Sequence, residues 1–284
     1  MSPKCVSSLG AAAALVVALL SPAVAQNIPQ QDVPRQDIPR LDVPFVPTPP
    51  QVVERMLKLA GVTKDDFVID LGSGDGRIPV AAARIYGARA LGVDIDPRRI
   101  AEARENARKA GVSDKVSFAQ QNLFDAKISD ASVITMYLLW NINLELRPRL
   151  LTELKPGTRI VSHSFDLGEW EADTRDTVEN RSIYMWTVPE QVSGRWQLQA
   201  GERLMSLELK QQFQQVNGAA TIDGRTAPLR SIHLNGRMIE FVVDIDGTPT
   251  IFSGEVNGDT IDARPPRRVD GAKPAGHWRA SRAS

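Results

Sequence analysis

The chain has 284 residues with 34 basic and 34 acidic side chains, so its formal net charge is zero. This balance gives no bulk electrostatic case for binding nucleic acid or an anionic membrane. A hydrophobic content of 42% and a charged content of 24% are ordinary for a folded protein, and the length allows one large domain or two small ones. The single cysteine, Cys5, excludes an intrachain disulfide and a thiolate metal site, and we expect no metal.

Residues 1–25 have the parts of a secretory signal peptide. Lys4 supplies a positive charge, Leu9 to Leu20 form an apolar run too short to span a bilayer comfortably, and Ala23-Val24-Ala25 offers a cleavage site. We therefore expect an exported, periplasmic protein whose mature chain has no transmembrane span. The alternative is a membrane anchor formed by the same segment when it is not cleaved. Residues 26–44 carry a proline at every fifth position and predict an extended linker.

The most informative motif is Asp70-Leu71-Gly72-Ser73-Gly74-Asp75-Gly76, which follows an apolar run and precedes a helical pattern. A strand, a glycine loop and a helix in this order bring backbone N–H groups close to a small ligand. In the dinucleotide pattern G-x-G-x-x-G, counted from Gly72, the third glycine would fall on Arg77. The spacing present, acid-x-G-x-G-x-G, instead favours S-adenosylmethionine (SAM) as the ligand over NAD. We expect Gly72, Gly74 and Gly76 to let the chain turn and to let the cofactor approach the backbone where a Cβ would collide.

Helical and strand patterns alternate between residues 49 and 188, which predicts a doubly wound, mostly parallel, Rossmann-like sheet as one domain over residues 45–190. Thr48 is expected to cap the first helix, which we place at residues 49–60. Further helices are expected from Ile78, from Pro97 to Gly111 and over residues 144–154. The expected strands are residues 67–71, 90–94, 116–119, 132–138, 158–162 and 183–188.

Residues 191–284 have no helical pattern and predict a separate all-β domain, an antiparallel meander that forms a small barrel or sandwich. Five dipeptides are typical of hairpin turns: Asn217-Gly218, Asp223-Gly224, Asn235-Gly236, Asp246-Gly247 and Asn257-Gly258. The end of the chain is rich in arginine and lysine, which predicts a solvated basic tail or a contact for an acidic partner.

Two polar side chains are candidates to hold the nucleoside part of the cofactor. Asp94 ends the second predicted strand, where an acid can accept both ribose hydroxyls. Asp96 is the competitor, but its place before Pro97 favours a helix cap. Asn122 ends the third predicted strand and can bond the adenine edge; alternatively, it bonds its own turn.

Residues 45–170 resemble class I SAM-dependent methyltransferases, and within them the branch of the ATP-synthase c-subunit lysine methyltransferases. The motifs that carry this resemblance are Pro44-Phe45-Val46-Pro47-Thr48, Asp70 to Ile78, Gly92-Val93-Asp94-Ile95-Asp96-Pro97 and Tyr137-Leu138-Leu139. The resemblance implies that Asp70 and the glycine loop, Ser73 included, bind the methionine end of SAM. It also implies that Asp94 binds the ribose, that adenine lies near Asn122, and that residues 45–48 fold over the cofactor.

The sulfonium of SAM already activates the methyl group, so methyl transfer needs alignment of the acceptor and exclusion of water more than side-chain chemistry. We expect Tyr137 and Trp140 to flank the acceptor, or else to pack under the next helix. His163 and Asp166 are candidates to take a proton, and the alternative for His163 is a structural role. The leading hypothesis is therefore a methyltransferase acting on a protein, with lysine implied by the resemblance, or on a small molecule. Nucleic acid is not expected, because an Asn-Pro-Pro-aromatic motif is absent. The alternatives are an NAD-linked oxidoreductase and an exported, non-catalytic binding protein whose β domain binds a ligand or partner.

Overall fold

The N-terminal part of the described chain forms a seven-stranded sheet. The structure, a computed structural model, describes residues 45–266 and 271–283. The strand order is β3-β2-β1-β4-β5-β7-β6, in which β1 to β5 pair in parallel and β7 runs antiparallel between β5 and β6. The strands are β1 (Phe67–Leu71), β2 (Arg89–Asp94), β3 (Val116–Gln120), β4 (Val133–Met136), β5 (Arg159–His163), β6 (Thr174–Val178) and β7 (Arg181–Thr187). This confirms the predicted doubly wound, mostly parallel sheet.

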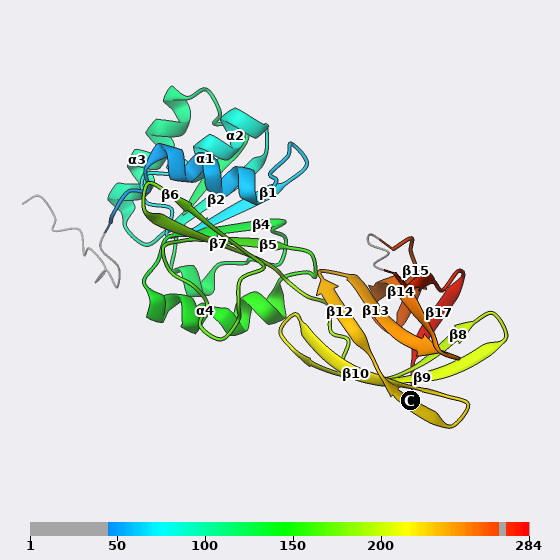
Figure 1. Cartoon of the computed structure of the whole chain (residues 1–284). Helices are drawn as coiled ribbons and strands as arrows, with labels where there is room; N and C mark the ends of the chain where they lie inside the picture. The colour runs from blue at the N-terminus through cyan, green and yellow to red at the C-terminus, as the bar shows by residue number, and fades with distance from the viewer. Residues whose placement is uncertain (1–44, 267–270, 284) are drawn as a thin grey trace, which may run out of the picture. The chain divides into compact units, whose positions relative to one another are not determined.

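Helices cover both faces of this sheet (Figure 1). One face carries α1 (Pro50–Leu59), α2 (Arg77–Tyr86) and α3 (Pro97–Lys109), whose apolar sides share a buried cluster with the sheet. The other face carries α4 (Trp140–Glu153), which packs its buried leucines against the opposite side of the same strands. The carboxyl ends of the parallel strands, where ligands bind in such sheets, thus lie between two covered faces.

Three expectations for the first half are wrong in detail. The first helix begins at Pro50 after the N-cap Pro49, and Thr48 does not cap it, because its hydroxyl is engaged elsewhere. The fourth helix begins at Trp140 rather than at residue 144, and it contains Pro148. The edge strand β6, which alternates half-buried and exposed residues, lacks an apolar run and was not predicted.

The second half forms a separate, antiparallel sheet that curls into a near-barrel, as predicted. Its order is β11-β10-β9-β8-β17-β15-β14-β13-β12, and the short strand β16 pairs in parallel with β14. The two end regions of this order approach each other, since β10 lies against β12. The strands are β8 (Gly194–Ala200), β9 (Arg203–Gln212), β10 (Gln215–Ile222), β11 (Arg225–Pro228), β12 (Arg230–Asn235), β13 (Met238–Ile245), β14 (Thr248–Asn257), β15 (Thr260–Ala263), β16 (Lys273–Pro274) and β17 (Trp278–Arg282).

Four of the five predicted hairpin dipeptides lie at turns between paired strands, and Asn217-Gly218 does not. Gly218 lies inside β10, opposite Leu209 of β9, and the β9–β10 turn falls at Phe213-Gln214. A Cβ at Gly218 would overlap the carbonyl oxygen of Glu208. This glycine is therefore required by close approach of two strands and not by a turn.

The interior of the second sheet is filled by side chains. Phe241 stacks on Phe252 with ring centroids 5.2 Å apart, and Trp278 meets both rings edge-on. Trp196 is also fully buried in this cluster. The barrel-like sheet thus has a packed aromatic core.

Three of the arginines near the C-terminus, all among the described residues, form ion pairs with neighbouring strands and do not belong to a solvated tail. Arg264 pairs with Glu255, Arg279 with Asp262 and Arg282 with Asp259. Trp278–Arg282 form β17, which lies between β15 and β8. The expected tail is wrong because alternating charge on a strand resembles a charged extension in the sequence.

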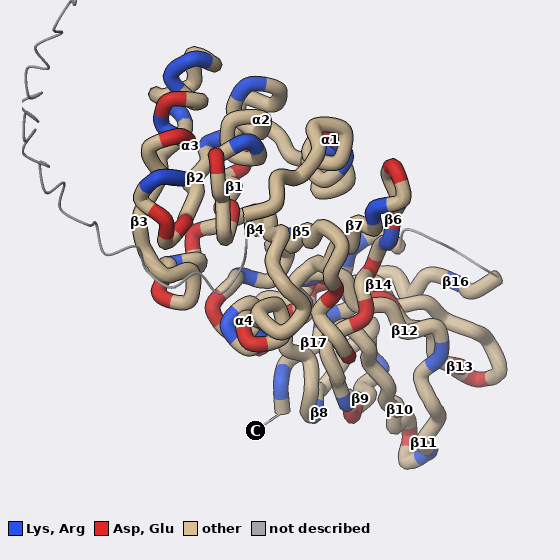
Figure 2. The backbone as a smooth tube through the Cα atoms, turned by 90° about the vertical axis from the view of Figure 1, so that its left-hand side faces the viewer, with Lys and Arg blue, Asp and Glu red and all other residues tan. Residues whose placement is uncertain are grey.

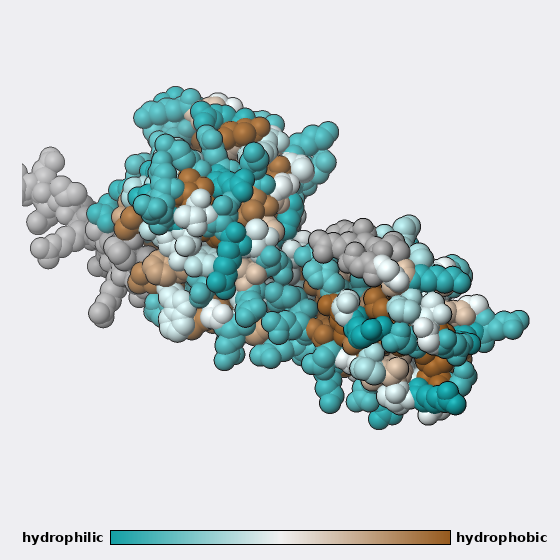
Figure 3. Space-filling view, in the orientation of Figure 1, coloured by the Kyte–Doolittle hydropathy of each residue, from teal (hydrophilic) through white to brown (hydrophobic). Residues whose placement is uncertain are grey.

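The surface carries no region of one strong character in the views shown. Lysine and arginine alternate with aspartate and glutamate along the chain (Figure 2). Apolar residues show as small patches separated by hydrophilic ones (Figure 3). No helix in the described residues is long and apolar enough to cross a membrane. The predicted signal peptide and linker, residues 1–44, lie outside the described residues.

Candidate active site

The glycine loop lies at the carboxyl end of β1, where it connects to α2. Gly72, Gly74 and Gly76 all have left-handed φ angles, of 77°, 53° and 77°. Side-chain atoms of the protein itself fill the space that a Cβ would occupy: Leu138 at Gly72, Phe45 at Gly74 and Phe118 at Gly76. Glycine is therefore needed for backbone conformation and for packing of the protein against the loop. The positive φ angles confirm the expected turn, and the packing of protein side chains against the loop is a further reason that was not predicted.

Asp70, the last acid before the loop, is buried with 2% of its surface exposed. Its Oδ1 accepts a 2.7 Å hydrogen bond from the Thr135 hydroxyl of β4. Burial raises the pKa of the Asp70 carboxyl to about 7; the Thr135 bond opposes this rise, and the carboxylates of Asp94 and Asp75 add to it. A buried acid of this kind has a strong preference for a cationic partner.

Asp94 is the last residue of β2, the strand next to β1. Its carboxylate bonds both to the glycine loop and to the residue that caps α3. Its Oδ2 accepts from the Gly74 N–H at 2.8 Å, and its Oδ1 accepts from the Asp96 N–H at 2.9 Å. These bonds fix the carboxylate at the pocket wall and leave further lone pairs for a ligand. Asp96 caps α3 by accepting from the Arg98 N–H, as the sequence indicated.

Asn122 lines the same pocket at the end of β3. Its Oδ1 accepts a 3.0 Å bond from the Phe124 N–H and so caps the short 3-10 helix Leu123–Asp125. The alternative prediction for Asn122, a side chain that bonds the backbone of its own turn, is thus confirmed. The amide nitrogen remains available to a ligand in the pocket.

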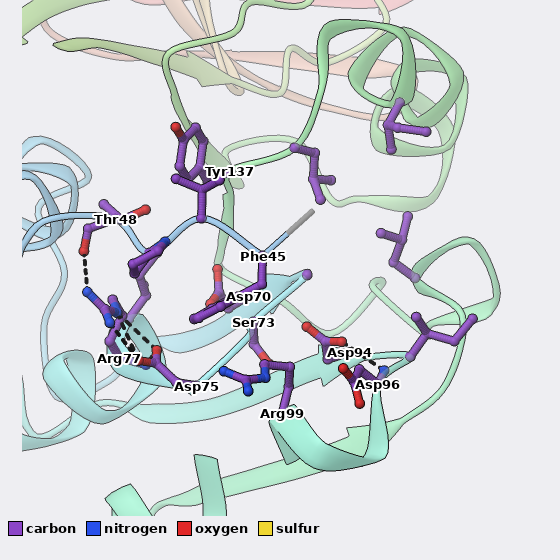
Figure 4. Close-up of a pocket in the computed structure, with 18 of the residues that line it drawn as sticks. Phe45, Thr48, Asp70, Ser73, Asp75, Arg77, Asp94, Asp96, Arg99 and Tyr137 are labelled. Carbon is purple, nitrogen blue, oxygen red and sulfur yellow. Dashed lines mark hydrogen bonds and ion pairs between the residues drawn. The ribbon is translucent and has the colours of Figure 1, made fainter. Parts of the chain in front are cut away.

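Residues 45–48, here called the strap, lie across this pocket (Figure 4). Arg77 Nη1 donates to the Thr48 carbonyl at 2.8 Å, while the same guanidinium binds Asp75. The Arg99 guanidinium lies over the Phe45 ring at 4.6 Å. The sequence did not predict a role for Arg77 or Arg99. Arg77 was noted only because it stands where the dinucleotide pattern requires a glycine, and Arg99 is part of no recognised motif.

The pocket between strap, glycine loop and strand ends fits SAM by its chemistry. SAM carries a positive sulfonium and a positive ammonium, and the two acids Asp70 and Asp94 line the pocket. Ser73 Oγ, also in the lining, is buried and has no hydrogen-bond partner within the described structure. An unsatisfied buried hydroxyl is uncommon and points to a ligand group.

The three candidates for the acceptor side lie in different places. Tyr137, just after β4, lines the pocket. Trp140 is 51% exposed, lies outside the pocket lining, and donates its Nε1–H to Asp166 at 3.1 Å. His163 is fully buried behind the lining, where its ring packs on Tyr137 with centroids 3.8 Å apart. Burial, with the charge of Arg181, lowers the pKa of His163 to about 4.

Comparison with known proteins identifies the family of this site. The model of the ANTKMT methyltransferase domain matches residues 70–174. A protein-lysine N-methyltransferase of Saccharolobus islandicus is 46% identical over 151 residues, which cover 51% of this chain and 94% of that protein. The chain belongs to the SAM-dependent methyltransferases.

Two further similarities agree with this assignment of a methyltransferase. A solved structure of an RNA methyltransferase from Salinibacter ruber with S-adenosylhomocysteine (SAH) is 52% identical, with a TM-score of 0.51, and covers 52% of this chain and 96% of that one. A human ATP-synthase c-subunit lysine N-methyltransferase is 30% identical over 129 residues, 45% of this chain and 54% of that protein. The methyltransferase uses SAM, and the non-catalytic alternative is not favoured.

Proposed function

We propose that this methyltransferase transfers the methyl group of SAM to a lysine of a protein. The observation that carries the proposal is the 46% identity to a protein-lysine N-methyltransferase that is matched over 94% of its length. A small-molecule acceptor, which the sequence left open, has no comparable support.

The chemistry asks little of the side chains. Bound SAM supplies an already activated methyl group, so the protein must hold the acceptor nitrogen in line and exclude water. In this proposal Asp70, Ser73 and the glycine loop hold the methionine end, and Asp94 and Asn122 hold the nucleoside. Tyr137 borders the acceptor side, with Trp140 at its outer edge.

The test is methylation of a cell extract by the purified full chain with methyl-labelled SAM. We expect label in protein, recovered as methyl-lysine by mass spectrometry, and loss of label with Asp94→Ala. Asp114→Ala, an exposed acid outside the pocket, is the matched control and should retain activity.

An RNA acceptor is the second candidate, because a 52% identical protein of known structure is named an RNA methyltransferase. It is tested in the same reaction by splitting the extract with nuclease and with protease. Label that survives nuclease and is lost to protease supports a protein acceptor; the reverse result replaces lysine by RNA.

We also propose that the protein is exported through residues 1–25 and works in the periplasm. The charge, apolar run and small-residue site described above support this proposal. Fractionation of the full chain with a C-terminal tag tests it: a shortened product in the periplasmic fraction is expected. A full-length product in the membrane fraction would favour the anchor, and one in the cytosol would end the proposal.

A further inference from the structure

His163 and Thr48 form a buried pair that joins the strap to β5. Thr48 Oγ1 and His163 Nδ1 lie 3.1 Å apart, although 115 residues separate them in the chain. Thr48 is 4% exposed and His163 is fully buried. His163 lies outside the pocket lining, whereas Thr48 is part of it, so the histidine can influence the pocket through the threonine.

The hydrogen bonds of His163 indicate its tautomer. Its Nε2 is buried and has no partner in the described part of the chain. A buried N–H without an acceptor is rarer than a buried acceptor without a donor. Nε2 is thus the bare nitrogen, and Nδ1 carries the proton and donates it to Thr48 Oγ1. The hydroxyl proton of Thr48 is then free to be donated into the pocket that this residue lines.

The pocket has two ends, and Thr48 lies at the end away from Asp94, the residue expected to bind the ribose. Figure 4 shows Thr48, Arg77 and Asp75 at one end and Asp94 and Asp96 at the other, with Asp70 between them and Tyr137 above. Asp94 is on β2 and His163 on β5, and β1 and β4 separate these two strands. If Asp94 holds the ribose, the Thr48 end faces the amino-acid part of the cofactor.

That amino-acid part carries a carboxylate, which a hydroxyl donor at this end would bind; the nearby Asp75 is already paired with the Arg77 guanidinium. We propose that Thr48 donates a hydrogen bond to the carboxylate of SAM, and that His163 is the positioning residue that directs this hydroxyl and fastens the strap. His163 then acts in cofactor binding and not as a proton acceptor in the reaction. The bond between Arg77 and the Thr48 carbonyl holds the same residue from its other side.

The test compares the binding of two adenosine thioethers, measured by calorimetry with the full chain. SAH keeps the amino-acid part with its carboxylate and ammonium, and 5′-methylthioadenosine lacks that whole part. Thr48→Val and His163→Ala are expected to weaken SAH binding about 10-fold, the value of one hydrogen bond to a charged group. Binding of methylthioadenosine should change by less than about 2-fold, a difference too small for a lost hydrogen bond.

Conservative variants separate positioning from general damage. Thr48→Ser keeps the hydroxyl, and His163→Asn places an amide donor near the Nδ1 position; both should bind SAH within about 2-fold of the unchanged chain. Hydrogen exchange of the strap should be slowed by SAH in the unchanged chain and in His163→Asn, and much less in His163→Ala.

Two results would overturn the proposal. One is Thr48→Val with unchanged SAH affinity, which can be read even if His163→Ala does not fold. The other is equal weakening of SAH and methylthioadenosine, since a strap that only covers the pocket has no preference for the carboxylate.

Discussion

At the scale of single residues, the surroundings of Asp70 disfavour its charged form in the protein without a ligand. The carboxyl is buried, receives one hydroxyl bond from Thr135, and faces two other acids. Its pKa of about 7 exceeds the 3.8 of an ordinary aspartate, so the folded protein retains a proton that the unfolded chain loses. The stability that this proton provides is complete below about pH 4 and is lost as the pH rises through about 7.

Asp70→Asn should therefore remove a pH dependence from the cofactor-free protein. The free energy of unfolding of the unchanged chain should fall by up to about 4 kcal/mol relative to Asp70→Asn between about pH 4 and about pH 8. Urea unfolding at the two pH values measures this difference. SAH affinity should fall in the variant, because its amide cannot balance the ligand's ammonium. Parallel stability curves for the two proteins would refute the argument.

Gly74→Ala tests why glycine is required in the loop. Gly74 has a φ of 53°, and a Cβ there would overlap the Phe45 ring of the strap. Gly111 has a φ of 68° with nothing within 4 Å, so Gly111→Ala carries the backbone strain alone. Both variants should lose about 1 kcal/mol of stability, and Gly74→Ala alone should lose SAH affinity, measured by calorimetry. Equal SAH affinity in the two variants would show that the strap does not depend on this contact.

At the scale of elements, the sequence predicts best where a local pattern decides the structure. The strand at 67–71 and the helix start at Pro97 match their expected positions, since an apolar run and an Asp-Pro cap act locally. The pocket acids follow from strand ends for the same reason. The strap anchors could not be predicted, because Arg77, Arg99 and His163 reach Phe45 or Thr48 from distant elements. The turn predicted at Asn217-Gly218 is wrong, because the sequence alone does not distinguish a glycine required by a turn from one required by a close neighbouring strand.

A comparison of Gly218→Ala with Asn217→Ala distinguishes an Asn-Gly pair in a hairpin turn from one inside a strand. In a tight turn both residues need left-handed backbone, and losing the asparagine is harmful. In β10, Asn217 is exposed and extended, so its replacement should change stability by less than about 0.5 kcal/mol. Gly218→Ala should cost about 1–3 kcal/mol, because the new Cβ must displace the Glu208 backbone. Thermal unfolding monitored by circular dichroism ranks the two variants, and the reverse order would place a turn there after all.

At the scale of the whole molecule, the last described strand completes the second sheet. β17 pairs with β15 on one side and β8 on the other, and so joins two meanders that are separate in the chain. Its first residue, Trp278, is 2% exposed and packs edge-on against Phe252 at 5.4 Å. The next residue, Arg279, is exposed and pairs with Asp262.

Trp278→Ala should therefore lower the free energy of unfolding by about 3–5 kcal/mol, as expected when a large buried aromatic is removed. Arg279→Ala, one residue away on the outer face, should change it by less than about 1 kcal/mol, because an exposed ion pair contributes little. Urea unfolding followed by tryptophan fluorescence and circular dichroism measures both. If Trp278→Ala lowers the free energy of unfolding no more than Arg279→Ala does, the C-terminal segment is the solvated tail that its charge predicted. A large loss would show that burial of Trp278 in β17 is needed for the stability of the second sheet.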